Sequence, residues 1–260
     1  DAPTDLALSA NTVDENVANG TSVGTVSATD PDSGDTQSYS LTDTAGGRFA
    51  IDSSTGEITV ANGTLLNYEA AASHSVTVRV TDSGGLTYDE TFTVNLTNVN
   101  ESPTGADATV TINEDGSHTM TAANFGFSDV DAGDSLSAVR IDTLPGAGSL
   151  TLSGVAVTAG QVITVADITA GNWVFTPVAG ANGTGYASFT FSVRDSNNTY
   201  DAAPNTLTVN VTAANDAPTD LALSANTVAE NAANGTSIGT VSGTDPDSGD
   251  TQSYSLTDTA

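Results

Sequence analysis

The sequence predicts an all-β chain, built as tandem β-sandwiches in a linear array. Three observations favour this class: short segments in which apolar and polar residues alternate, turn-forming residues between those segments, and a long internal repeat. Alternation with a period of two places every second side chain on one face of a strand, and many short strands separated by turns are typical of sandwiches.

The first hundred residues contain the clearest strand patterns. In residues 74–80 (HSVTVRV) three valines alternate with polar side chains, and residues 92–96 continue the same pattern. Residues 49–52 (FAID) and 57–60 (EITV) flank the tetrapeptide SSTG. Because glycine adopts positive φ without steric strain, Gly56 can close a hairpin there.

The second hundred residues have the same alternation with larger side chains. It occurs at 149–158 (SLTLSGVAVT), 173–178 (WVFTPV) and 187–193 (ASFTFSV). Trp173 lies within such a strand, so we expect it in the core rather than as a platform on which a sugar stacks.

A long repeat divides the chain. Residues 216–260 restate residues 1–45 with four differences, at an offset of 215 residues. The segments TVNLTNVNESPT (93–104) and TVNVTAANDAPT (208–219) each end a predicted strand in a proline-containing linker, and proline blocks continuation of a strand. We therefore place modules at 1–100, 101–215 and 216–260, the last being the start of a further repeat in a longer array.

The charge balance restricts the partners. The chain has 32 acidic and 4 basic residues, a net charge of −28, and no cysteine. This charge repels nucleic acid and anionic lipid and attracts divalent cations, which bind oxygen ligands directly. Without disulfides or thiolate sites, we expect calcium to staple the modules outside the cell. No apolar run is long enough to cross a membrane, so we expect no insertion by this segment.

Acidic residues gather in short groups at predicted strand ends. The groups are DEN (14–16), DPDSGD (30–35), NYE (67–69), NVNE (98–101) and DVDAGD (129–134), with Asp82 and Asp195 apart from them. A single DPDSGD is most simply a turn, and solubilising charge would be scattered over exposed faces. Repeated groups at strand ends instead indicate calcium, which takes six to eight oxygen ligands.

These spacings resemble the cadherin repeats, in particular the cadherin-like repeats of large calcium-dependent (RTX-type) bacterial surface adhesins. The segment DEN (14–16) resembles the family motif x-E-N, DPD (30–32) resembles D-x-D, and LNYE (66–69) resembles L-D-x-E. VTD (80–82) and the linker NVNESP (98–103) complete the pattern. Residues 175–195 resemble a second type of adhesin repeat. The resemblance implies cadherin-like, Ig-like Greek-key sandwiches with calcium at the junctions between modules.

The same resemblance implies the calcium ligands. At the first junction they are Glu15, Asn67, Glu69, Asn98, Asn100 and Glu101 with Asp129, Asp131 and Asp195. At the second they are Glu114, Asn215 and Asp216 with Asp245 and Asp247; Asp1, Asp30, Asp32 and Asp82 form half a site at the N-terminal end, and Glu230 repeats Glu15. Asn67 replaces the usual Asp at the first junction, so we expect fewer or weaker ions there. The second module has no L-D-x-E, so we expect a looser second junction.

The function predicted from these features is mechanical and adhesive. No nucleophile elbow, P-loop or dinucleotide fingerprint occurs, and the paired carboxylates lie at linkers, so we expect no enzyme. We expect a calcium-stiffened extender segment of a giant bacterial cell-surface adhesin, serving cell adhesion and biofilm attachment, whose partners are neighbouring repeats. The alternatives are a subunit of an extracellular calcium-dependent fibre or surface layer, with modules that pair laterally between chains, and direct recognition of a ligand such as polysaccharide.

Overall fold

The computed structural model describes residues 1–247 and 249–257, so residues 248 and 258–260 of the predicted third module lie outside the described residues. These residues form two compact units. The first comprises Asp1–Glu101 with Val130–Gly133, and the second comprises Ser102–Asp129 with Asp134–Ala260. Both are built almost wholly of strands, which confirms the predicted all-β sandwich class. No helix among the described residues is long and apolar enough to cross a membrane.

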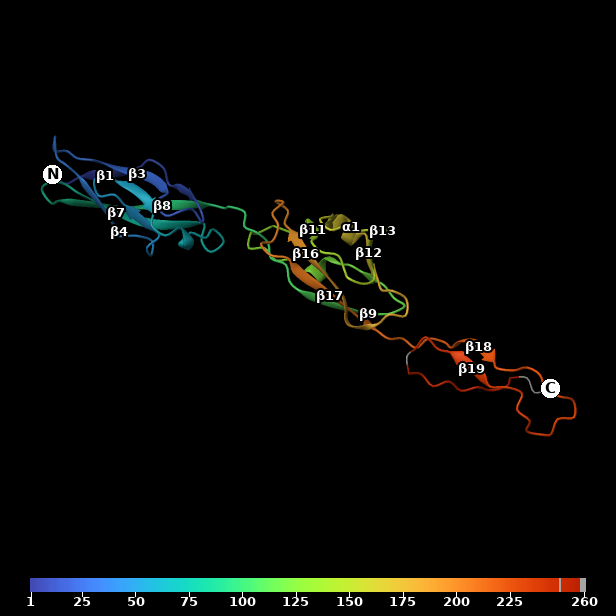
Figure 1. The fold of residues 1–260 in the computed structure, drawn as a ribbon. Coiled ribbons are helices and arrows are strands. Elements are labelled where there is room, and N and C mark those ends of the chain that lie inside the picture. The colour runs from blue at the N-terminus through green and yellow to red at the C-terminus, as the bar shows by residue number, and fades with distance from the viewer. Residues whose placement is uncertain (248, 258–260) are drawn as a thin grey trace. The chain divides into compact units, whose positions relative to one another are not determined.

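The first unit is a sandwich of two four-stranded sheets (Figure 1). Its elements are β1 (Thr4–Leu8), β2 (Thr12–Asp14), β3 (Ser22–Thr29), β4 (Ser38–Asp43), β5 (Phe49–Ile51), β6 (Glu57–Val60), the 3₁₀ helix η1 (Gly63–Leu65), β7 (Ser73–Thr81) and β8 (Thr87–Thr97). One sheet has the order β1-β3-β6-β5 and the other β2-β8-β7-β4. β5 and β6 form the predicted hairpin, in which Gly56 has φ +73°.

The core of the first unit lies between the sheets and is rich in valine. Val76, Val78 and Val80 of β7 are fully buried and face Phe49 and Ile58 of the other sheet. Burial of each such side chain contributes roughly 1.5–3 kcal/mol relative to exposure. The alternation of valine and polar side chains in residues 74–80 therefore identifies the strand face that lies in the core.

The N-terminal segment passes from one sheet to the other between β1 and β2. This change of sheet determines which residues meet at one end of the sandwich. β1 pairs antiparallel with β3, whereas β2 pairs parallel with β8, with Asp14 opposite Thr97. Parallel strands run toward the same edge of a sheet. The residues that follow β2 and those that follow β8 consequently meet.

The second unit contains two larger sheets and a separate pair of strands. Its elements are β9 (Ala108–Asn113), β10 (His118–Thr119), η2 (Ala122–Phe125), β11 (Ala138–Ile141), β12 (Ser149–Leu152), β13 (Val155–Ala156), β14 (Val162–Thr164), α1 (Val165–Thr169), β15 (Trp173–Thr176), β16 (Gly183–Arg194), β17 (Asn205–Thr212), β18 (Thr219–Leu223) and β19 (Val241–Thr244). The sheets have the orders β10-β15-β12-β13 and β14-β11-β16-β17-β9, and β18 pairs with β19 alone.

Aromatic side chains fill the core of the second unit. Trp173 is fully buried and stacks on Phe125, with ring centroids 5.0 Å apart and planes at 4°, while Phe189 and Phe191 pack beside them. Stacked aromatic pairs add about 0.5–1.5 kcal/mol beyond their area burial. This confirms Trp173 as a core residue.

As in the first unit, an early strand of the second unit pairs parallel with the last strand of its sandwich. β9 pairs parallel with β17, and Asn113 lies opposite Thr212. β16 pairs antiparallel with β17, and Gly183 at its start lies opposite Val211. The residues after β9, before β16 and after β17 therefore gather at one edge.

Candidate metal sites

Three glutamates converge at the end of the first unit where β2 and β8 terminate. Glu15 follows β2, Glu101 follows β8, and Glu69 lies in the loop before β7, which starts where β8 ends. One carboxylate oxygen from each lies within 4.8 Å of the others. These three residues, here called the glutamate cluster, were all predicted from the sequence.

Hydrogen bonds from the backbone hold Glu15 in place. Glu15 is 1% exposed. Its Oε2 accepts from Tyr68 N at 2.7 Å, and its Oε1 accepts from Val99 N at 2.9 Å. A carboxylate with both oxygens bonded to N–H groups is fixed in direction.

Glu101 has an oxygen that the protein does not satisfy. Its Oε1 accepts from Asn16 Nδ2 at 2.7 Å and its backbone N–H donates to Asp131 Oδ2 at 2.8 Å. Its Oε2 is buried without a hydrogen-bond partner. Burial raises the pKa of Glu101 above its ordinary value of 4.5, and the negative charges of Glu15, Asp131 and Glu69 raise that pKa further.

A second group of carboxylates, the N-terminal aspartate cluster, lies at the opposite end of the first unit. It consists of Asp30 after β3, Asp35 before β4 and Asp82 after β7. Asp82 accepts from Leu86 N at 2.8 Å and Asp35 from Ser83 Oγ at 2.9 Å, while Asp30 Oδ2 is buried without a partner. Asp32 is exposed and instead accepts from the N-terminal amine of Asp1.

The second unit carries the mixed cluster of Glu114, Asp216 and Asp247, whose carboxylate oxygens also lie within 4.8 Å of one another. Glu114 follows β9 and is 3% exposed. Its Oε1 accepts from Ala214 N at 2.7 Å, and Asp216 N donates to Asp247 Oδ2 at 2.6 Å. A hollow of about 420 Å³ opens beside these residues.

Asn182 completes the mixed cluster and was not predicted from the sequence. Its Nδ2 donates to Glu114 Oε2 at 2.8 Å. This bond, followed by that from Ala214, lowers the pKa of Glu114. The pKa of Asp216 is raised, mainly by the charge of Asp115 and then by burial. The signal that could have found Asn182 is its place directly before β16, which corresponds to that of the LNYE loop before β7.

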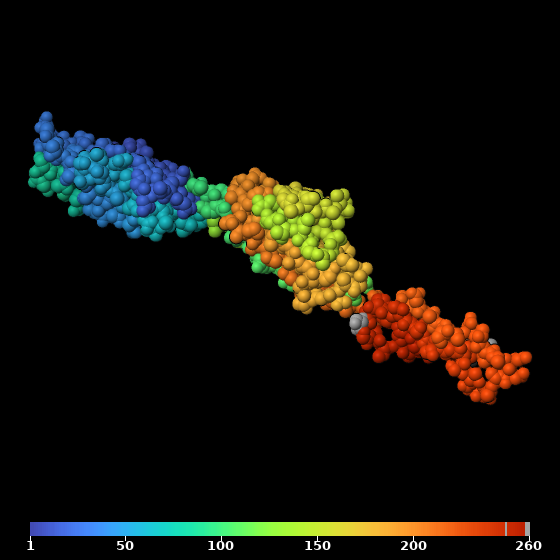
Figure 2. All heavy atoms as spheres, viewed as in Figure 1, coloured from blue at the N-terminus to red at the C-terminus, as the bar shows by residue number. Residues whose placement is uncertain are grey.

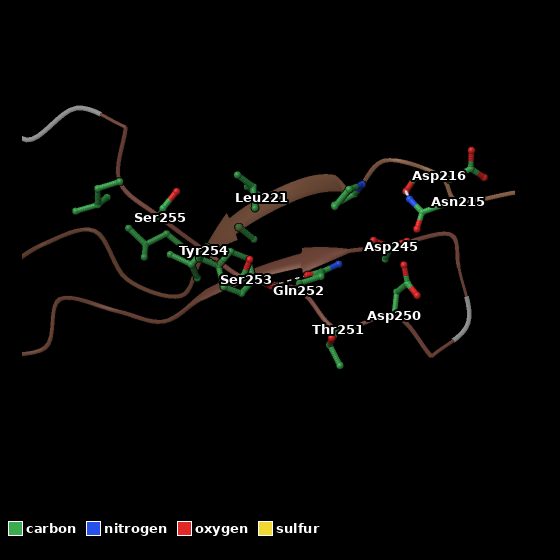
Figure 3. Close-up of a pocket in the computed structure, with 15 residues that line it drawn as sticks. Asn215, Asp216, Leu221, Asp245, Asp250, Thr251, Gln252, Ser253, Tyr254 and Ser255 are labelled. Atoms are coloured by element: carbon green, nitrogen blue, oxygen red, sulfur yellow. Dashed lines mark hydrogen bonds between the residues drawn. The ribbon is translucent and has the colours of Figure 1, made fainter.

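The third aspartate of the sequence D-x-D-x-G-D was also not predicted as a member of these clusters. Asp35 belongs to the N-terminal aspartate cluster, and Asp250 lies with Asp245 and Asp247. In Figure 3 the side chains of Asp216, Asp245 and Asp250 lie at the same end of the β18 and β19 pair. The recurrence of the third aspartate in all three DxDxGD segments was the available signal.

The other predicted residues lie as follows. Asn67 is exposed and its Oδ1 accepts from Ala70 N at 2.6 Å, closing a turn. Asn98 and Glu230 are exposed. Asn100 and Asn215 each donate from Nδ2 to the next backbone carbonyl, at 2.7 and 3.1 Å.

Two further predicted ligands, Asp129 and Asp195, belong to the second unit. Asp195 is fully buried after β16, and its Oδ1 accepts from Thr199 N at 2.7 Å. Asp129 is half-buried. The neighbouring Asp134 accepts from Ser196 Oγ at 2.6 Å, which ties two loops of this unit together.

The donor chemistry of these clusters fits a hard divalent cation. Each cluster offers carboxylate oxygens only, and no cysteine exists in the chain. Calcium prefers oxygen ligands and tolerates irregular geometry, whereas zinc favours nitrogen and sulfur. Buried oxygens without donors, Glu101 Oε2 and Asp30 Oδ2, are the atoms that a cation would satisfy.

Comparison with known proteins gives two domain matches. Residues 10–97 match the cadherin domain, and residues 99–212 match the cadherin-like domain. Human cadherin-related family member 2 is 37% identical over 94 residues, which is 35% of this chain and 7% of that protein. The chain thus spans a small fraction of this relative.

Solved structures show the same fold. Human protocadherin-24 EC1-2 is similar with a TM-score of 0.53 at 19% identity, over 80% of this chain and 97% of that one. The protocadherin gammaB7 EC3-6 cis-dimer structure is similar with a TM-score of 0.55 at 20% identity, over 95% and 62%. The chain therefore carries tandem domains of the cadherin and cadherin-like type.

Proposed function

We propose that this chain is a calcium-stiffened extender segment of a large cell-surface adhesin, composed of modules at 1–100, 101–215 and 216–260. The observation that carries the proposal is the glutamate cluster, where Glu101 has a buried oxygen with no donor beside two further carboxylates. Cadherin domains typically bind calcium, and this chain contains such a domain.

Electrostatic repulsion between the carboxylates supports a cation in the glutamate cluster. Unit charges at 4 Å repel by about 4 kcal/mol at an effective dielectric constant near 20. Burial is the largest cause of the raised pKa of Glu101, and the repulsion by the neighbouring carboxylates adds to it. A calcium ion would neutralise it and hold the end of β2, the loop before β7 and the residues after β8 together.

We propose Glu15, Glu69 and Glu101 as the principal ligands of this site and Glu114, Asp216 and Asp247 as those of the second. The remaining residues implied by the cadherin resemblance, including Asp129 and Asp195, are proposed as further ligands. Dissociation constants of about 10⁻⁴ to 10⁻³ M are typical of extracellular calcium modules. Stiffness would then follow the external calcium concentration.

The setting proposed is the outside of a cell. Cadherin ectodomain relatives are extracellular, and the acidic, cysteine-free composition suits a calcium-rich medium. We propose the cell surface of a bacterium, in adhesion and biofilm attachment, because the motifs and long near-identical repeats resemble those of bacterial adhesins. We propose a mechanical role and no catalysis.

Small-angle scattering of the full chain, with calcium and with chelator, tests the proposal. Calcium should lengthen the maximum dimension and narrow the distribution of conformations. An unchanged maximum dimension and profile after chelation would contradict stiffening by calcium.

A fibre or surface layer with laterally paired modules is the second candidate. The near-identical segment at 216–260 favours it, because interchangeable repeats suit regular assembly. Electron microscopy separates the two: single threads indicate an extender, and regular bundles indicate a fibre.

A further inference from the structure

Three side-chain oxygens of the second unit are buried without a hydrogen-bond partner and lie outside the clusters described above. They are Oδ1 and Oδ2 of Asp201, in the loop between β16 and β17, and Oδ1 of Asn205, the first residue of β17. In Figure 2 the segment that joins β16 to β17, coloured orange, presents closely packed atoms on the visible face. Because native proteins pair nearly all buried polar groups, these oxygens point to a partner outside the chain.

The backbone at Gly105, before β9, comes close to both residues. A Cβ atom at Gly105 would lie 2.2 Å from Asn205 Oδ1 and 3.4 Å from Asp201 Oδ2, so the two oxygens surround one point. Glycine permits such a close approach of the backbone because it has no side chain. Nearby, Asp107 Oδ1 accepts from Thr206 N at 2.7 Å, which holds the residues before β9 against the start of β17.

The hydrogen-bond donors beside Asp201 are engaged with other acceptors. Ser192 is a neighbour of Asp201, but its one hydroxyl hydrogen is donated to Asp142 Oδ2 at 2.8 Å. Arg140 donates from Nε to Asp142 Oδ1 at 2.7 Å and from Nη2 to Ser192 Oγ at 3.1 Å. Arg140 and Asp142 thus form an ion pair, whereas no ion pair among the described residues involves Asp201.

A buried carboxyl group in this position is stable when it is protonated or when it is paired with a cation. Burial raises the pKa of Asp201 above its ordinary value of 3.8; the charge of Asp142 raises it further, whereas Ser192 and Arg140 lower it. A protonated carboxyl could donate one hydrogen to Asn205 Oδ1 but would leave its other oxygen unpaired. A cation satisfies all three oxygens, since carboxylate and amide oxygens are both ligands of hard metal ions.

We propose that Asp201 and Asn205 form an additional calcium site inside the second unit, which shares no residue with the glutamate, N-terminal aspartate and mixed clusters. Asp201 supplies two oxygens and a negative charge, and Asn205 supplies one neutral oxygen. Calcium takes six to eight oxygen ligands in irregular geometry, so backbone carbonyls and water complete the shell. Because the site has a single carboxylate, its affinity is lower than that of the glutamate cluster. The proposal does not depend on calcium binding by that cluster.

Equilibrium dialysis of the full chain with calcium, for the wild type and for Asp201→Asn, tests the proposal. This change keeps the shape of the side chain and removes its charge. Asp201→Asn should bind one calcium ion fewer than the wild type, and the control Glu57→Gln on β6 should bind the same number. The fluorescence of Trp173, the one tryptophan, reports whether each variant forms the core of the second unit.

Asn205→Asp is the complementary variant, because it adds a carboxylate at the same point. It should bind calcium a few-fold more tightly at this site, since ligand charge sets affinity. An unchanged number of ions in Asp201→Asn, or unchanged affinity in Asn205→Asp, would overturn the proposal.

NMR titration of the wild-type carboxyl groups tests the site without any substitution. Calcium should lower the pKa of Asp201, because a bound cation favours the ionised carboxylate. A pKa of Asp201 that stays raised and does not respond to calcium would overturn the proposal and indicate a protonated carboxyl that donates to Asn205 Oδ1. The response of Glu101 is read in the same spectra, so a failure of the glutamate cluster is distinguished from a failure of this site.

Discussion

The glutamate cluster of the first unit and the mixed cluster of the second are built on the same plan. In each, a buried glutamate follows the N-terminal strand that runs parallel to the last strand of its sandwich. Glu15 accepts from Val99 N and Glu114 from Ala214 N, in both cases two residues before the acidic residue of the linker. Glu101 N and Asp216 N each donate to an aspartate some thirty residues onward.

The two clusters differ in the loop before the penultimate strand. The first has the carboxylate of Glu69 there, whereas the second has the amide of Asn182, which donates to Glu114. The bond from Asn182 lowers the pKa of Glu114, whereas the pKa values of Glu101 and of its counterpart Asp216 are both raised. The amide of Asn182 stabilises the negative charge of Glu114, whereas the glutamate cluster has a third carboxylate in the same position. We therefore expect the glutamate cluster to depend more strongly on calcium.

Glu15→Gln should produce the largest effect. The amide places an NH₂ group against either Tyr68 N or Val99 N, and a buried donor without an acceptor destabilises by about 1–3 kcal/mol. We expect the free energy of unfolding of the first unit to fall by roughly 3 kcal/mol and its calcium dependence to weaken, measured by urea denaturation with and without calcium. Glu57→Gln on β6, outside the cluster, is the matched control, and it should change stability by less than about 0.5 kcal/mol. Equal effects of the two changes would contradict a special role for the buried carboxylate of Glu15.

Glu69→Ala should weaken calcium binding without destabilising the metal-free fold. Glu69 is exposed, so its loss should leave metal-free stability unchanged or slightly higher because repulsion is relieved. Calcium affinity should fall roughly tenfold, since ligand charge sets affinity in such sites. Calorimetric titration measures this change, with Glu57→Gln on β6 as the control outside the cluster. Unaltered affinity would exclude Glu69 as a ligand.

Asn182→Asp should make the second cluster behave like the first. The new carboxylate loses the donor to Glu114 and adds a charge, so we expect tighter calcium binding by a few-fold and greater destabilisation by chelator. The glutamate cluster in the same chain is the internal control. If calcium dependence of the second unit were unaffected, the amide would not be the origin of the difference.

Acidification should act in opposite directions through Glu101 and through Glu114 in the metal-free protein. Because the pKa of Glu101 is raised, its ionisation destabilises the fold above the ordinary value of 4.5, and lowering the pH relieves this. Because the pKa of Glu114 is lowered from 4.5, its stabilisation is present above that value and is lost as the pH falls through the folded pKa. NMR titration of both carboxyl groups checks the two directions, and shifts of the same sign would contradict the comparison.

The strands that could be predicted from the sequence are those in which apolar and polar residues alternate, because the apolar residues form the buried face. The valines of 74–80 and the Gly56 hairpin are examples, because alternation and positive φ are local properties. Pairing is not local. β2 pairs with β8 and β4 pairs with β7, and no local pattern in β2 or β4 indicates these partners.

The predicted sites follow the same division. Glu15, Glu69 and Glu101 were predicted because motif spacing places them at strand ends, and the structure brings them together. Asn182 and Asp35 were not predicted as members of their clusters, because they lie in loops, where strand alternation places no side chain; their signals were a place before β16 and a recurrent D-x-D-x-G-D segment. Asn67 occupies a position of the family motif, yet its side-chain oxygen accepts from Ala70 N and closes a turn.

Equilibrium dialysis with calcium tests the central claim most directly, by counting the ions bound to the full chain and to the chain with Glu15→Gln and Glu69→Ala. The account predicts saturable binding to the wild-type chain, with dissociation constants of about 10⁻⁴ to 10⁻³ M, and the loss of at least one bound ion in the variant. The same number of ions bound with the same affinity would contradict the glutamate cluster as a calcium site.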